Sequence, residues 1–136
     1  MDSNSTSLGI KIDWSEIDLF GHINNVAILK YVQSARVHLL ETLGLMASQA
    51  GEKKGPILAS VDCQFIKPLF YPGTVTIHST ISLIKTTSFR ITHTIYNDKT
   101  EVTAKANDII VLYDFITENK LRIDDNLRKK LESLNG

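Results

Sequence analysis

The segment that decides the fold reads NNVAILKYVQSARVHLLETLG and runs from Asn24 to Gly44. Its apolar residues recur at steps of three and four, which predicts one apolar stripe along a helix of about 18 residues. The stripe consists of Ile28, Leu29, Val32, Ala35, Leu39 and Leu43. Asn24 and Asn25 have short polar side chains that can accept hydrogen bonds from the amides of the first turn. Gly44 is expected to end the helix in the left-handed conformation.

Alternating apolar and polar residues on both sides of this segment predict strands. Leu8–Trp14 is expected to form a strand before the helix, and four long strands are expected between Ile57 and Ile116. Turn residues at Pro72-Gly73 and Asn97-Asp98 give connections so short that neighbouring strands must be antiparallel. In the last strand the apolar phase changes at Asn107-Asp108. That change predicts either a bulge or a strand that is buried on both faces.

This order of elements favours an α+β fold, in which an antiparallel sheet of about five strands wraps around one long helix. The arrangement is the hot-dog fold. A short polar helix is expected from Asp125 to Leu134. The 136 residues contain no linker or repeat, so we expect a single domain spanning 1–136 with a polar tail at 1–7.

Composition excludes several classes of function. Fifteen basic residues balance fifteen acidic ones, so no net charge attracts nucleic acid or an anionic membrane. The longest apolar run, Ile109 to Tyr113, is far shorter than the ~20 residues of a membrane span. Cys63 is the only cysteine, which excludes an internal disulfide and a multi-cysteine zinc site. Because the N-terminus lacks the features of a signal peptide, we expect a cytoplasmic protein.

The loop between the first strand and the helix holds the strongest candidate site. A helix N-terminus presents free amides and the positive end of the helix dipole, which can stabilise an oxyanion. Asp18 lies shortly before that end, and Gly21 permits a left-handed backbone or a close approach. A carboxylate beside such amides can catalyse acyl transfer. The alternative is that Asp18, Asn24 and Asn25 serve only as turn and cap residues.

Two stretches of sequence, Asp18–Asn25 (DLFGHINN) and Tyr31–Arg36 (YVQSAR), resemble the 4-hydroxybenzoyl-CoA thioesterase-like family of hot-dog acyl-CoA thioesterases. Two weaker similarities lie at Phe65–Gly73 and at Thr87–Phe89, the latter matching a serine-containing hairpin of the family. The resemblance extends over about residues 8–134.

The resemblance implies roles for individual residues. Asp18 corresponds to the catalytic carboxylate of the family, and the backbone amide of Asn25 to the group that polarises the thioester carbonyl. His22 either takes part in catalysis directly or only forms local hydrogen bonds. Gly21, Asn24 and Asn25 are predicted to bind substrate.

The sequence departs from two related groups. Plant-type acyl-carrier-protein thioesterases have an asparagine two residues after the aspartate, where this chain has Phe20, so an Asp–Asn–His mechanism is in doubt. Hot-dog hydratases separate their Asp and His by five positions with Asn-Pro between. Here Asp18 and His22 are four apart with no proline, which argues against that activity.

A local basic cluster is needed to bind coenzyme A, because the chain as a whole is neutral. Lys85 and Arg90 flank the Thr86-Thr87-Ser88 turn, which resembles the coenzyme-facing hairpin of the family. Lys85, Ser88 and Arg90 are therefore predicted to bind substrate. The alternative is that Lys85 and Arg90 are ordinary exposed charges on a hairpin.

The resemblance thus implies an acyl-CoA thioesterase that needs no metal and no organic cofactor, coenzyme A being part of the substrate. Hot-dog relatives pair their open strand edges into a continuous dimer sheet, so the resemblance implies a homodimer or homotetramer, with the partner completing the site. The alternatives are a non-catalytic acyl-thioester-binding or structural hot-dog protein, and an acyl-carrier-protein thioesterase. The sequence does not decide which acyl group is used.

Other reactive residues fit structural roles better. Cys63 lies in the same strand phase as the apolar residues Val61 and Phe65, so a packing role is expected. The four histidines, at 22, 38, 78 and 93, show no metal-ligand spacing. The run Arg128-Lys129-Lys130 is expected on a solvated helix face.

Overall fold

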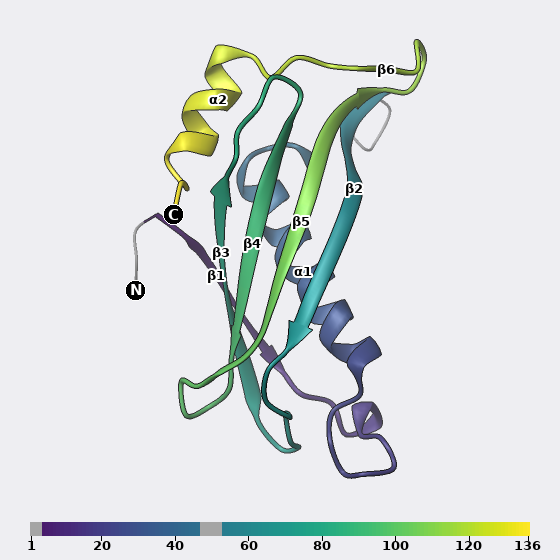
Figure 1. Ribbon diagram of the computed structural model, residues 1–136, viewed down its shortest axis with the longest axis vertical. Coiled ribbons are helices and arrows are strands. Elements are labelled where there is room, and N and C mark those ends of the chain that lie inside the picture. Colours follow the sequence, from purple (N-terminus) through teal and green to yellow (C-terminus); the bar gives the residue numbers. More distant parts are fainter. Residues whose placement is uncertain (1–3, 47–52) are drawn as a thin grey trace.

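The computed structural model describes residues 4–46 and 53–136 of the chain. The elements in chain order are β1 (Thr6–Lys11), the 3-10 helix η1 (Trp14–Glu16), α1 (Asn25–Thr42), β2 (Lys54–Phe65), β3 (Thr74–Ser82), β4 (Ser88–Tyr96), β5 (Val102–Asp114), β6 (Asn119–Lys120) and α2 (Asp125–Glu132). The strands form an antiparallel sheet in the order β1-β3-β4-β5-β2, and the short β6 pairs with β5. The long helix α1 lies along one face of this sheet (Figure 1). The predicted α+β hot-dog fold is confirmed.

Helix α1 begins and ends as its sequence predicts. The side-chain oxygen of Asn24 accepts a hydrogen bond from the Ala27 amide at 2.7 Å, and Gly44 has a φ of +77°. The predicted stripe is wrong at one position, because Leu29 is 42% exposed. Leu29 is rotated by about 100° from Ile28 around the helix, away from the sheet. Three residues absent from the predicted stripe, Ala27, Tyr31 and Leu40, are buried.

The first strand is shorter than predicted. It ends at Lys11, and Trp14, expected inside it, begins η1 and is 71% exposed. The cause is a capping box: Asp13 accepts a hydrogen bond from the Ser15 amide, and its own amide donates to Glu16 Oε1 at 3.0 Å. This local hydrogen bonding competes with strand pairing and turns the chain toward the candidate site.

The change of apolar phase in β5 is not caused by a bulge. The register of β5 with β4 and β2 runs through Asn107 and Asp108 without a shift, and the only register shift between β2 and β5 among the described residues lies between Leu58 and Ser60 of β2. The predicted bulge at Asn107-Asp108 is therefore wrong. Asp108 instead occupies an inward position with 0% exposure, in phase with the apolar residues of the core face. Val111 on the opposite phase is also buried, as the second alternative predicts.

Among the described residues, the core consists of two clusters along the length of α1. One lies beneath the first half of the helix and includes Ile23, Ala27 and Val75. The other lies beneath the second half, where Leu39 and Ile123 pack together with residues of α2. The first cluster holds the loop before α1 against the beginning of β3, and this packing positions the candidate site.

Candidate active site

Asp18 is held in a tight loop by the main chain. Its Oδ1 accepts hydrogen bonds from the amides of Phe20 at 2.8 Å and His22 at 3.1 Å, and its own amide donates to the His22 carbonyl at 2.7 Å. Gly21 closes the loop with a φ of +80°, a conformation that favours glycine. Within the described residues Oδ2 accepts no hydrogen bond, which leaves it available to a water molecule or a substrate.

The N-terminus of α1 presents two uncommitted amides next to this loop. The Asn24 side chain accepts a hydrogen bond from the Ala27 amide through Oδ1 and donates one through Nδ2 to the Glu16 carbonyl at 2.9 Å. No hydrogen bond within the described part of the chain uses the amides of Asn25 and Val26, which precede the first intrahelical donor. Asn24 therefore shapes the site as a cap and a loop tie, while the Asn25 amide is placed to receive an anionic or carbonyl oxygen.

The backbone of His22, not its ring, contacts Asp18. The imidazole packs edge-on against Phe70, with ring centroids 5.1 Å apart and an interplanar angle of 86°. The two residues also form an isolated antiparallel bridge between the loop and the segment before β3. The local hydrogen bonding that the sequence left open is therefore present. A direct role of the His22 ring in a reaction stays a prediction.

A buried phenol ties η1 to α1 behind the loop. Tyr31 donates from its hydroxyl to Glu16 Oε1 at 2.6 Å, and the same oxygen accepts the Asp13 amide. Burial, and then the hydrogen bond to Glu16, raise the pKa of Tyr31 far above its ordinary value. The phenol therefore stays protonated and acts as a structural donor. The sequence interpretation included Tyr31 in a motif but assigned it no role.

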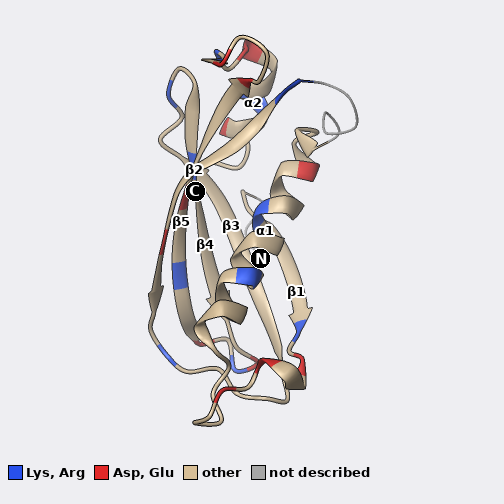
Figure 2. Cartoon of the chain, turned by 90° about the vertical axis from the view of Figure 1, so that its right-hand side faces the viewer, with Lys and Arg blue, Asp and Glu red and all other residues tan. Residues whose placement is uncertain are grey.

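The predicted coenzyme-binding residues cluster on the β3–β4 hairpin. The Lys85 amide donates to the Ser88 carbonyl at 2.8 Å, and Arg90 Nε donates to Ser82 Oγ at 3.0 Å. Within one chain this hairpin lies at the end of the sheet near α2, opposite the loop that holds Asp18 (Figure 1). The Lys and Arg positions are scattered over strands and helices (Figure 2). The structure thus places Lys85, Ser88 and Arg90 on one hairpin, which in the same chain is far from Asp18.

Sequence reasoning missed a chain of buried polar groups across the sheet. Ser79 Oγ lies 2.7 Å from His93 Nδ1, and His93 Nε2 lies 2.6 Å from Asp108 Oδ2. Arg36 of α1 donates to the same carboxylate through Nε at 2.8 Å and Nη2 at 3.1 Å. Ser79, His93 and Asp108 are at most 1% exposed. One consistent set of protons has Ser79 donating to a neutral His93, which donates to the Asp108 carboxylate.

The strand patterns of the sequence already indicated buried ionisable residues at His93 and Asp108. His93 follows the apolar phase of Phe89 and Ile91, and Asp108 interrupts the apolar phase of β5. An ionisable residue at an inward strand position needs a partner. Which partner it has depends on the strand register and on the face of α1, and neither can be derived from spacing alone.

Asp108 makes the stability of the protein depend on pH. Burial raises the pKa of Asp108, but the hydrogen bonds from His93 and Arg36 outweigh burial and hold the pKa below its ordinary value. A depressed folded-state pKa stabilises the protein above the unfolded value, near pH 4, and this stabilisation is lost as the pH falls through the folded value. We expect the free energy of unfolding to fall more steeply between about pH 5 and pH 3 in the wild type than in Asp108→Asn. Urea unfolding at stepped pH measures this, and equal slopes would contradict it.

Cys63 has the surroundings of a packing residue. It lies on β2 against the first core cluster, as the sequence predicts. Burial, and then the nearby carboxylates of Asp62 and Asp108, raise the pKa of its thiol, which disfavours a nucleophilic thiolate. In the part of the chain that the structure describes, no three His, Cys, Asp or Glu residues converge on a metal-sized site. No described helix is both long enough and apolar enough to cross a membrane.

Comparison with known families decides the membership of this chain. A family model described as the thioesterase-like superfamily matches residues 12–131. The chain belongs to the thioesterase-like superfamily. A relative in sequence is the long-chain acyl-CoA thioesterase FadM of Escherichia coli (strain K12), which is 23% identical to this thioesterase-like protein over 126 residues, 92% of this chain and 96% of the relative.

Solved structures agree with this fold. A predicted thioesterase from Bacillus stearothermophilus superposes with a TM-score of 0.86 at 23% identity, covering 97% of each chain. A 1,4-dihydroxy-2-naphthoyl-CoA thioesterase from Synechocystis gives a TM-score of 0.84 at 14% identity, covering 96% of this chain and 97% of its own. The predicted family is confirmed.

Proposed function

We propose that this thioesterase-like protein hydrolyses acyl-CoA to a carboxylic acid and free coenzyme A, with Asp18 as the catalytic carboxylate. The observation that carries the proposal is that Asp18, whose Oδ2 accepts no hydrogen bond from the described residues, lies in the loop that leads directly into the uncommitted amides of Asn25 and Val26. Sequence similarity to FadM, a long-chain acyl-CoA thioesterase, supports coenzyme A as the carrier.

The proposed reaction needs one base and one oxyanion donor. The thioester oxygen accepts a hydrogen bond from the Asn25 amide, where the helix dipole stabilises the charge that develops. Asp18 removes a proton from water as the water oxygen attacks the carbonyl carbon. The carbon–sulfur bond then breaks, and the sulfur leaves as the thiol with that proton. In the alternative, Asp18 attacks the carbonyl itself, the carbon–sulfur bond breaks with release of the coenzyme A thiolate, and water then cleaves the resulting anhydride.

A panel of acyl-CoA and acyl-carrier-protein thioesters, read out by release of free thiol, tests this proposal. The panel should span short, long and aromatic acyl groups. Turnover of one or more acyl-CoA members is expected. Turnover of carrier-protein thioesters alone would favour the carrier-protein activity. Binding without turnover of any member would favour a non-catalytic acyl-binding protein.

The free edge at β2 supports a dimer. This twelve-residue strand forms one edge of the sheet, and its inward side leaves Leu58, Val61 and Phe65 between 41% and 45% exposed. Long apolar edge strands invite pairing with another chain. We propose that two copies pair β2 with β2 around a two-fold axis. Antiparallel pairing would place the Phe65 end of one β2, near its Asp18 loop, beside the Lys54 end of the partner.

Light scattering is expected to give at least twice the mass of one chain at assay concentration. The exposed apolar residues of β2 are the physical reason, since pairing would remove them from water. The measurement should be combined with activity in the same sample. A monomer with full activity would contradict both the assembly and a site completed by the partner.

Replacing Lys85 and Arg90 with alanine is expected to raise KM for acyl-CoA severalfold. Small thioesters that lack the nucleotide should keep their KM, because only the coenzyme phosphates would lose a charged contact. Alanine at Lys129 and Lys130, two exposed lysines of α2, is the matched control and should leave both KM values unchanged. An equal rise for both substrate types would contradict coenzyme binding by the hairpin.

A further inference from the structure

Glu16 joins η1 to α1 through both its main chain and its side chain. Its carbonyl accepts hydrogen bonds from the amide of Asn24 and from Asn24 Nδ2, each at 2.9 Å. Its Oε1 accepts the Tyr31 hydroxyl at 2.6 Å and the Asp13 amide at 3.0 Å. Glu16 is therefore connected both to the cap residue that precedes the Asn25 amide and to the second turn of the helix.

The loop that carries Asp18 starts and ends at this connection. Ile17, directly after Glu16, forms an isolated antiparallel bridge with Ile23 at the other end of the loop. The Asp18 carboxylate and the Asn25 amide are thus attached to one common base. A movement of Glu16 relative to α1 would therefore shift the Asp18 carboxylate with respect to the Asn25 amide.

The Tyr31 hydroxyl supplies a second attachment point at a different height along the helix. Tyr31 lies six residues beyond Asn25, about 9 Å farther along the axis of α1. Hydrogen bonds at Asn24 alone would let η1 rotate about that end of the helix, whereas two separated attachments fix its direction. A hydroxyl that donates to a carboxylate forms a stronger hydrogen bond than two neutral groups do. Water competes little for this one, because Tyr31 is buried.

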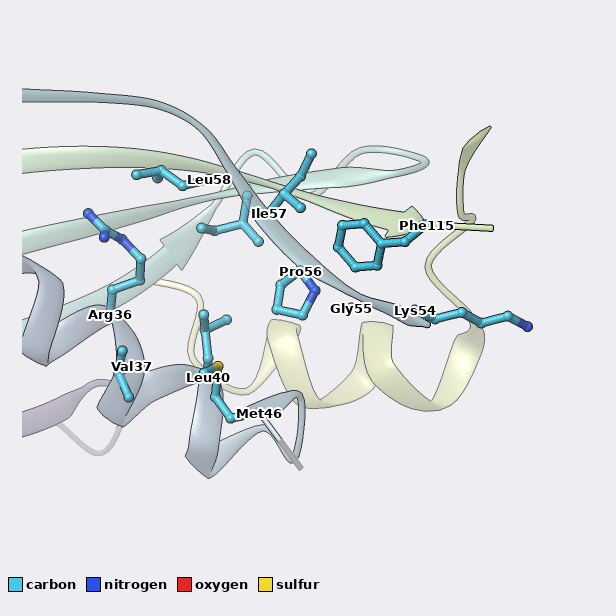
Figure 3. Close-up of a pocket in the computed structure, with 11 residues that line it drawn as sticks. Arg36, Val37, Leu40, Met46, Lys54, Gly55, Pro56, Ile57, Leu58 and Phe115 are labelled. Atoms are coloured by element: carbon cyan, nitrogen blue, oxygen red, sulfur yellow. The ribbon is translucent and has the colours of Figure 1, made fainter. Parts of the chain in front are cut away.

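The other parts of the molecule do not depend on this hydrogen bond. The Tyr31 ring packs in the first core cluster and would stay there without its hydroxyl. Neither Glu16 nor Tyr31 lines the cavity of about 460 Å³ beside Leu69 and Phe70. Neither lines the cavity of about 480 Å³ between the second half of α1 and the first half of β2, which Figure 3 shows. Loss of the hydrogen bond should therefore change the direction of η1 without reshaping either cavity.

We propose that Glu16 and Tyr31 are positioning residues for the hydrolysis, and that their hydrogen bond sets the placement of the Asp18 carboxylate relative to the Asn25 amide. The inference rests on the proposed function. In this role neither residue touches the thioester, and both act through Asp18 and the Asn25 amide. A misplacement of about 1 Å between reacting groups can lower a rate about 100-fold, so a single hydrogen bond of this kind can control kcat.

Tyr31→Phe tests this inference by removing only the hydroxyl. We expect kcat for the best acyl-CoA to fall by about 10- to 100-fold. KM should change by less than about threefold, because the contacts with the substrate remain. Tyr96→Phe is the matched control, since it removes a hydroxyl from a ring that packs against His78 on the sheet, and its kcat should equal that of the wild type. Urea unfolding of each variant gives its stability separately.

Substitutions at Glu16 connect the effect to the hydrogen bond itself. Glu16→Gln keeps an oxygen that can accept from Tyr31 and should keep most of the activity, whereas Glu16→Ala should lose at least as much as Tyr31→Phe. The double variant Glu16→Ala with Tyr31→Phe should lose no more than Glu16→Ala alone. Because η1 contains no buried residue, the two Glu16 variants are expected to fold and give the answer even where Tyr31→Phe does not fold.

Several results would overturn the role of the hydrogen bond. A wild-type kcat in Tyr31→Phe or in Glu16→Ala would do so, whether or not the free energy of unfolding falls. So would a loss confined to KM, equal losses in Glu16→Gln and Glu16→Ala, or losses that multiply in the double variant. The proposed function would survive each of these results, because the wild type still turns over acyl-CoA. Absence of turnover by the wild type with every thioester would overturn the proposed function and this inference with it.

Discussion

Asp18→Asn is expected to lower kcat by about 10²- to 10⁴-fold, the usual contribution of a positioned general base. The asparagine oxygen can still accept the amides of Phe20 and His22, so the loop and the fold should survive. KM should change far less, because the lost interaction belongs mainly to the transition state. Steady-state kinetics on the best acyl-CoA, with circular dichroism to verify folding, measure both.

Asp114→Asn is the matched control. Asp114 also accepts two backbone amides through one carboxylate oxygen, those of Ile116 and Thr117. It lies at the end of β5, in the turn that leads to β6. If aspartates in such turns are only structural, both substitutions should leave kcat near the wild-type value. Retention of more than about half of the wild-type kcat in Asp18→Asn would show that the site is assigned wrongly.

The second large effect concerns stability. Arg36→Gln should lower the free energy of unfolding by about 3–5 kcal/mol, because it leaves the Asp108 carboxylate buried without its cationic partner. Adding Asp108→Asn removes that uncompensated charge and should recover much of the loss. Urea unfolding of the two variants and the wild type gives the coupling between the two positions.

Lys67→Gln provides the comparison with an exposed ion pair. Lys67 and Glu101 are 2.6 Å apart, but their side chains are 51% and 41% exposed. Exposed pairs contribute only about 0–1 kcal/mol, since water screens them. If Arg36→Gln and Lys67→Gln lowered the free energy of unfolding by similar amounts, the role assigned to the buried polar groups would be contradicted.

The fold was predictable because its signals are local. The Asn24 cap, the left-handed Gly44 and the period of α1 each depend on residues a few positions apart. The strand alternation likewise depends on neighbours along the chain. The predicted extension of β1 to Trp14 was wrong. The capping box at Asp13 forms local hydrogen bonds that compete with strand pairing, and the alternation of apolar residues does not reveal them.

The candidate site was predictable only in part. The Asp18 loop and the helix amides lie within one short segment, so their proximity follows from the sequence. The row of buried polar groups from Ser79 to Arg36 joins three strands and a helix. Predicting it requires the register of the strands and the face of α1 that is turned toward them. The position of the Lys85 hairpin at the far end of the sheet likewise follows from topology, not from spacing.

Single turnover in heavy-oxygen water tests most directly whether Asp18 performs the hydrolysis. With enzyme in excess, the wild type is expected to consume the bound acyl-CoA at once. Label only in the product acid would indicate a general base, and label first in the Asp18 carboxylate would indicate an anhydride. Asp18→Asn should bind the same acyl-CoA and leave it almost intact over that time. Label incorporation and thiol release at the wild-type rate in Asp18→Asn would contradict the account.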